Sequence, residues 1–292
     1  MKKKIANLFI VGFPKSGTTS LANYLGLDKR ISLSDPKEPH FYLANSNQLQ
    51  LAKTFEDYSK FFKKNKSTKY FLDASTNYIF STEALKLIKK STINPKIIIM
   101  LRNPVDMILS MHQQFLQSLD EDQENFMDAW NLQDRRRKGF DIPKHCRYSH
   151  LLQYENAGKI SKHVERAVKI FGKKNIFFVQ FDVFISKPNE TLKNIYEFID
   201  LSHQDIGELK NFNPSKRFRN FFLKKVANYS PRFFYKILMT LRNSQKFKFI
   251  PVALNKLFKV NYKNNYSDEI YSFLDGKFKY EINKLSEFIN NK

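Results

Sequence analysis

Short apolar runs alternate along the chain with segments in which apolar residues recur every three or four positions. Runs rich in β-branched and aromatic residues predict buried strands at residues 7–12, 69–75, 96–102 and 175–182. The helical pattern predicts amphipathic helices at residues 18–26, 81–90, 104–119 and 161–172. Strands that alternate with helices indicate an α/β fold with a parallel sheet flanked by helices. In such a sheet, ligands bind at the carboxyl ends of the strands.

The last third of the chain has a different pattern. Between Glu208 and Asp268 there are 14 lysines and arginines and no acidic residue, and aromatic residues are interleaved with them. This stretch predicts two or three short basic amphipathic helices, and residues 268–290 predict a terminal helix. We therefore predict an α/β core over residues 1–220 and a basic helical C-terminal extension over residues 221–292, packed on the same domain.

Composition restricts the class of protein. The chain has 292 residues, a formal net charge of +22 and a single cysteine, Cys146, so an intrachain disulfide framework is excluded and a reducing compartment fits. The apolar run near the N-terminus ends at Pro14 and Lys15, which is too short for a membrane span. We expect a cytoplasmic protein, with the charge favouring an anionic partner.

The stretch "NLFIVGFPKSGTTSLANYLG" at residues 7–26 has the order strand, glycine-bearing turn, helix. Backbone N–H groups of such a turn and the helix N-terminus converge on one point, which makes an anion site. Gly12 and Gly17 have the spacing of the nucleotide triphosphatase loop, but Thr18 stands where that loop has its lysine. The lysine lies inside the loop instead, as Lys15.

The loop "FPKSGTTSL" resembles the 5′-phosphosulfate-binding loop of sulfotransferases that use 3′-phosphoadenosine 5′-phosphosulfate, and bacterial relatives of the heparan sulfate-type enzymes in particular. The resemblance implies a P-loop-type sheet. It also implies that Lys15 contacts the oxygen bridging phosphate and sulfate, and that the loop holds the 5′-phosphate through Ser16, Gly17, Thr18, Thr19 and Ser20.

A second segment, "KIIIMLRNPVDMILSMHQQF", resembles the 3′-phosphate-binding segment of the same family. Arg102 follows a predicted strand, and Ser110 lies about two turns into the helix that Pro104 opens. A guanidinium offers forked donors to a phosphate, and a serine hydroxyl can add a further hydrogen bond. The resemblance therefore implies that Arg102 and Ser110 bind the 3′-phosphate.

The segment "DPKEPHFY" at residues 35–42 resembles the one that carries the catalytic carboxylate of heparan-type members. Glu38 is in that position and is the expected base, and His40 is the alternative base because imidazole titrates near neutrality. In "FLDASTNYIF", many of these members have a lysine after the acidic residue, whereas this chain has Ala74 after Asp73. This difference removes one cation from the implied site. Tyr78 is either an acceptor contact or part of the core.

A further segment, the basic stretch "FNPSKRFR" at residues 212–219, resembles the loop that closes over the nucleotide. Lys216 and Arg217, together with Arg219, are the candidates to reach the 3′-phosphate. The resemblance covers residues 5–220 and extends weakly beyond them. Elsewhere, His112 is expected to be packed or hydrogen-bonded, Trp130 is an acceptor contact or core, and the "RRRK" run at 135–138 is a solvated loop or an acceptor-binding patch.

The patterns together predict a transferase that moves a sulfuryl group from 3′-phosphoadenosine 5′-phosphosulfate to a hydroxyl or amine of a glycan, lipid or small molecule, with no metal. One alternative is a P-loop kinase that uses ATP–Mg²⁺. Another is a non-catalytic basic protein that binds nucleic acid or a membrane surface. For the enzyme we expect no nucleic-acid partner, and peripheral contact of the basic tail with anionic lipid on the inner face of the membrane.

Overall fold

The computed structural model describes residues 5–43, 50–144, 146–203, 216–218, 259–261 and 266–290. The chain divides into two compact units. The first is formed by Met1–Ile108, Glu155–Asn213 and Ser272–Lys292, and the second by Leu109–Tyr154 and Pro214–Tyr271. The predicted boundary at residue 220 lies outside the described residues, so it stays a prediction.

The first unit contains a five-stranded parallel sheet in the order β2-β3-β1-β4-β5. Its strands are β1 (Leu8–Gly12), β2 (Ile31–Leu33), β3 (Tyr70–Asp73), β4 (Lys96–Leu101) and β5 (Ile176–Gln180). All five residues of β1 are buried, because β3 and β4 flank this central strand and helices cover both faces of the sheet. The predicted parallel α/β fold and four of its five strands are confirmed.

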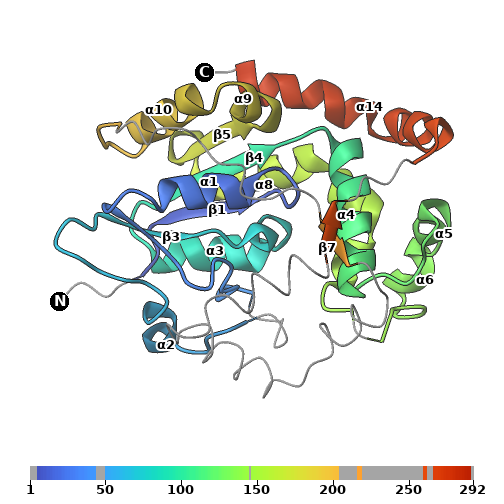
Figure 1. Ribbon diagram of the computed structural model, residues 1–292, viewed down its shortest axis with the longest axis horizontal. Helices are drawn as coiled ribbons and strands as arrows, with labels where there is room; N and C mark the ends of the chain where they lie inside the picture. The colour runs from blue at the N-terminus through green and yellow to red at the C-terminus, as the bar shows by residue number, and fades with distance from the viewer. Residues whose placement is uncertain are drawn as a thin grey trace. The chain divides into compact units, whose positions relative to one another are not determined.

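Helices lie on both faces of this sheet, as the alternation of strands and helices requires (Figure 1). On one face lie α1 (Thr18–Leu25), α9 (Phe181–Ser186) and α10 (Pro188–Phe198), and on the other lie α3 (Thr82–Ser91) and α8 (Ile160–Phe171). The short helices α2 (Phe55–Ser59) and α7 (Tyr154–Gly158) and the 3-10 turns η1 (Thr76–Phe80), η2 (Ser149–Leu152) and η3 (Lys173–Asn175) complete the connections.

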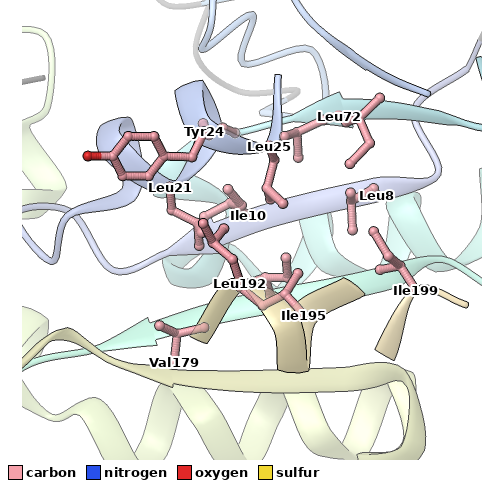
Figure 2. Close-up of a cluster of buried hydrophobic side chains, with 14 of the residues drawn as sticks. Leu8, Ile10, Leu21, Tyr24, Leu25, Leu72, Val179, Leu192, Ile195 and Ile199 are labelled. Atoms are coloured by element: carbon pink, nitrogen blue, oxygen red, sulfur yellow. The ribbon is translucent and has the colours of Figure 1, made fainter. Parts of the chain in front are cut away.

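The core beneath α1 explains why these segments fold together. Leu8 and Ile10 of β1 meet Leu21 and Leu25 of α1 and the apolar side of α10, and all of these side chains are fully buried (Figure 2). Each such side chain contributes roughly 1.5–3 kcal/mol by leaving water. The residues that join β1 to α1 are therefore held between two well-packed elements.

The second unit holds most of α4 (Pro104–Ser118), together with α5 (Phe126–Asn131) and α6 (Gln133–Arg137). It also contains the antiparallel pair of β6 (Lys216–Phe218) and β7 (Lys259–Asn261). The three residues of β7 lie in the stretch predicted as basic helices, so that prediction is wrong there. The other residues of the basic stretch lie outside the described part. The predicted terminal helix is present as α14 (Asp268–Asn290). No helix among the described residues is long and apolar enough to span a bilayer.

Candidate functional site

The loop between β1 and α1 has the geometry of an anion site. Gly17 precedes α1 with a φ of 81°, a left-handed conformation that glycine adopts without strain. Lys15 has a φ of 62°, which is uncommon for a residue with a side chain. Ser16 is fully buried and Thr18 nearly so, while Thr19 and Ser20 are half-buried. The first backbone N–H groups of α1 have no partners within the helix and remain available for an anion.

Close packing beneath the loop accounts for its first glycine. A Cβ on Gly12 would lie 2.6 Å from Cγ2 of Ile79, which belongs to the η1 turn after β3. Any larger residue would push β1 away from this turn. The loop is thereby fixed against the end of the neighbouring strand.

Arg102, the residue after β4, reaches back to this loop. Its Nη1 donates a hydrogen bond of 2.8 Å to the backbone carbonyl of Lys15. Burial, and then the nearby charge of Arg102, lower the pKa of Lys15. The Nε atom of Arg102 is buried and has no hydrogen-bond partner among the described residues. The two cations predicted from separate strand ends therefore lie together, with a donor still unused.

Phe181 is a residue of this site that the sequence analysis missed. It follows β5, and the guanidinium carbon of Arg102 lies 4.7 Å from the centre of its ring. A Cβ on Gly17 would be 3.0 Å from the same ring. Phe181 thus packs against both the loop and Arg102. The apolar run read as strand up to residue 182 concealed the turn into α9, which begins at Phe181.

The carboxylate of Glu38 lies beyond β2, at the same edge of the sheet. Its Oε2 is 3.5 Å from Oγ1 of Thr76 and 3.6 Å from Nε2 of His40. Its side chain is 30% exposed, whereas His40 is buried. The partly exposed carboxylate can meet an incoming acceptor, and the buried imidazole of His40 lies beside it. This geometry is compatible with either residue as the base.

Asp73, at the end of β3, is completely buried. Its oxygens accept hydrogen bonds from the hydroxyls of Tyr58, Ser75 and Tyr78 and from the backbone N–H of Ser75. Burial raises the pKa of Asp73 to about 6, and the hydrogen bonds from Ser75, Tyr58 and Tyr78 limit the rise. The backbone N–H of His40 donates to Oγ of Ser75, so this cluster supports the turn that carries Glu38 and His40. Tyr78 is therefore a core residue.

Four predicted phosphate-binding residues belong to the second unit, and their placement at the site stays a prediction. Ser110 is half-buried on α4. The backbone of Lys216 and Arg217 forms β6, and their side chains lie outside the described part, as does all of Arg219.

The second unit also corrects one prediction. Arg136, from the "RRRK" run, is not solvated: it donates two hydrogen bonds of 2.6 Å to the Glu121 carboxylate, and both side chains are fully buried. His112 is buried as expected, with Nδ1 and Nε2 each 2.9 Å from a partner, Tyr266 Oη and the Gln123 carbonyl. Trp130 is only 8% exposed and belongs to the core.

Burial raises the pKa of Cys146 to about 11, so this thiol stays protonated at neutral pH and is a poor nucleophile. Within the described ranges, no group of three or more His, Cys, Asp or Glu side chains is arranged to hold a metal ion. In the first unit, the candidate site consists of the loop between β1 and α1, Arg102, Glu38 and His40.

Comparison with known proteins shows the family of the chain. A family model described as "Sulfotransferase domain" matches residues 6–250. The chain belongs to the sulfotransferase domain family. Among solved structures, a sulfotransferase from Alicyclobacillus acidocaldarius is similar with a TM-score of 0.62 and 23% sequence identity, over 72% of this chain and 87% of that one. This likeness confirms the sulfotransferase-type α/β fold.

Curated relatives of this sulfotransferase domain are larger proteins. The chain is 24% identical over 228 residues to bifunctional heparan sulfate N-deacetylase/N-sulfotransferase 1 of Caenorhabditis briggsae, which covers 74% of this chain and 25% of the relative. It is 23% identical over 199 residues to heparan sulfate glucosamine 3-O-sulfotransferase 5 of Mus musculus, covering 68% of this chain and 54% of that protein. The chain therefore spans a quarter to a half of the length of these relatives.

Proposed function

We propose that the protein transfers a sulfuryl group from 3′-phosphoadenosine 5′-phosphosulfate to a hydroxyl or amine acceptor. Membership of the sulfotransferase domain family supports this proposal. The observation that carries it is the hydrogen bond from Arg102 to the Lys15 carbonyl, which joins the anion-binding loop to a second cation. A donor with phosphate at both its 3′ and 5′ positions needs two cationic sites of this kind.

The reaction follows from the placement of these groups. The acceptor oxygen or nitrogen attacks sulfur in line, and a new bond to sulfur forms while the bond from sulfur to the bridging oxygen breaks. The electron pair stays on that oxygen, which becomes part of the 5′-phosphate. Lys15 and the N-terminus of α1 stabilise the developing negative charge. The acceptor proton passes to Glu38, with His40 as the alternative base.

For the acceptor we propose a class of molecule, and the first choice is a glycan. The relatives named above are heparan sulfate enzymes, which supports a glycan hydroxyl or amine as acceptor. A lipid or small-molecule acceptor is the alternative. We further propose a cytoplasmic enzyme whose basic stretch between Glu208 and Asp268 meets the anionic inner face of the membrane, because that stretch has 14 lysines and arginines and no acidic residue.

Calorimetry with 3′-phosphoadenosine 5′-phosphate tests the donor site without an acceptor. We expect binding of the bisphosphate without added metal, and no preference for ATP–Mg²⁺. Lys15→Ala and Arg102→Ala should each weaken binding by roughly tenfold to a hundredfold, since each removes a charged hydrogen-bond donor. Lys89→Ala, an exposed lysine in the last turn of α3, is the control and should bind as the wild type does. Tighter binding of ATP–Mg²⁺ would contradict the proposal.

A further inference from the structure

Lys37, the residue before Glu38, has an ammonium group in the site that no role above uses. Its Nζ lies 2.5 Å from Oε1 of Glu38 and 3.5 Å from the backbone carbonyl of Ala74. We propose that Lys37 is a positioning residue for the Glu38 base: it holds Oε1, so that Oε2 is the oxygen that accepts the acceptor's proton. This inference rests on the proposed function.

The main chain of Lys37 is itself fixed. Its carbonyl accepts hydrogen bonds from Oγ of Ser34, at 2.9 Å, and from the backbone N–H of Ala74, at 3.4 Å. Lys37 is therefore tied to the ends of both β2 and β3. Its ammonium thus extends from a fixed main-chain position.

The two oxygens of Glu38 have different surroundings. Oε1 faces the ammonium of Lys37, whereas Oε2 faces weaker partners, the Thr76 hydroxyl at 3.5 Å and the His40 ring at 3.6 Å. An oxygen already bonded to a cation is the poorer proton acceptor. Oε2 can exchange its long contacts for a short bond to the acceptor, and this division orients the base.

A solvated ion pair between neighbouring residues would not orient the base in this way, because exposed pairs hold a fixed geometry only weakly. The Lys37–Glu38 pair is more sheltered, with side chains 21% and 30% exposed. In contrast, the Lys60–Asp57 pair on α2, at 2.8 Å, has side chains 64% and 50% exposed. This second pair provides a matched control.

Position 74 strengthens the inference. The resemblance to heparan-type members implied that alanine there removes a cation from the site. In the structure the ammonium of Lys37 contacts the carbonyl of that alanine. The positive charge beside the base is thus supplied by the residue preceding Glu38.

The experiment measures donor turnover in Lys37→Met, Lys37→Arg, Glu38→Gln and the double variant Lys37→Met/Glu38→Gln. Turnover is the release of 3′-phosphoadenosine 5′-phosphate from the donor, with de-N-sulfated heparin or with water as acceptor. We expect Lys37→Met to lower turnover by roughly tenfold to a hundredfold, as for loss of a hydrogen bond to a charged group. Lys37→Arg should retain most activity, and Lys60→Met all of it.

Two readouts separate positioning from a structural role. Lys37→Met should leave the calorimetric affinity for the bisphosphate unchanged. The double variant Lys37→Met/Glu38→Gln should have the same turnover as Glu38→Gln alone. A multiplied loss in the double variant, or unchanged turnover in Lys37→Met, would overturn the inference. A wild type that does not bind the bisphosphate, or that binds it and never turns over the donor, would instead overturn the proposed function.

Discussion

Lys15 and Arg102 place two positive charges close together, and this arrangement favours binding of an anion. Burial of Lys15, and then the positive charge of Arg102 nearby, disfavour the charged form of the lysine and lower the pKa of Lys15. An anion bound between them would offset both the burial and the repulsion. The strained backbone of Lys15, with its positive φ, is held in place by the hydrogen bond from Arg102 to its carbonyl.

Asp73 gives a prediction about pH. Its pKa of about 6 in the folded protein lies above the ordinary value of 3.8. Between pH 4 and 6 the folded state therefore binds more protons than the unfolded state, and this residue's contribution to the free energy of unfolding falls as pH rises. Relative to Asp73→Asn, the wild type should lose roughly 2–3 kcal/mol between pH 4 and 7. Urea denaturation across this pH range measures the difference.

Asp57 is the control for that experiment. Hydrogen bonds from Lys60 and Thr54 lower the pKa of Asp57, and its side chain is half exposed. The comparison of the wild type with Asp57→Asn should therefore show no fall in stability as pH rises from 4 to 7. A pH dependence of the same sign and size in both variants would contradict the role of burial at Asp73.

At the scale of helices and strands, the contact of α7 with α14 depends on the absence of a side chain. A Cβ on Gly158 would lie 2.3 Å from the ring of Phe278, which is almost fully buried. We expect Gly158→Ala to lower the free energy of unfolding by roughly 1–3 kcal/mol, because the ring has to move within a packed core. Chemical denaturation measures this loss.

Gly276, also on α14, is the matched control. Nothing lies within 4 Å of a Cβ at this position, which is exposed in the interior of the helix. Gly276→Ala should raise the free energy of unfolding by up to about 1 kcal/mol, through the higher helix propensity of alanine. Equal losses in the two variants would show that the packing of Phe278 is not the cause.

The elements differ in how far the sequence predicts them. Long apolar runs identified β1, β3, β4 and β5, whereas β2 has only three residues with a serine in the middle and leaves no readable pattern. The pairing of Arg136 with Glu121 was equally hidden, since the two side chains are 15 residues apart and meet only through the fold. Lys37 was given no role although it precedes Glu38 in the sequence, because only the structure shows its ammonium turned to the Glu38 carboxylate and the Ala74 carbonyl. Sequence motifs were sufficient to find the loop and Arg102. The residues that contact them, such as Phe181, could be found only from the folded structure.

For the molecule as a whole, the net charge of +22 should dominate long-range interactions. We expect the protein to bind vesicles that contain phosphatidylserine and to be released by high salt, since each basic residue near such a surface contributes about 1 kcal/mol. Substituting Lys224, Lys225 and Arg232 together by Gln should weaken vesicle binding by roughly a hundredfold or more on that scale. Vesicle sedimentation measures the affinity.

A second triple variant controls for net charge alone. Lys86, Lys89 and Lys90 are exposed on α3, and replacing all three with Gln removes the same charge from the first unit. Vesicle binding should then be nearly unchanged. Equal weakening by both triple variants would indicate attraction by total charge, without a dedicated surface in the basic stretch.

The hydrogen bond from Arg102 to the Lys15 carbonyl has one more consequence. The carbonyl and the N–H of a trans peptide point in opposite directions. With the Lys15 carbonyl turned toward Arg102, the N–H of Ser16 must point the other way, toward the opposite side of the loop. The arginine therefore fixes the orientation of this peptide plane, and Arg102→Ala would remove the hydrogen bond that holds it.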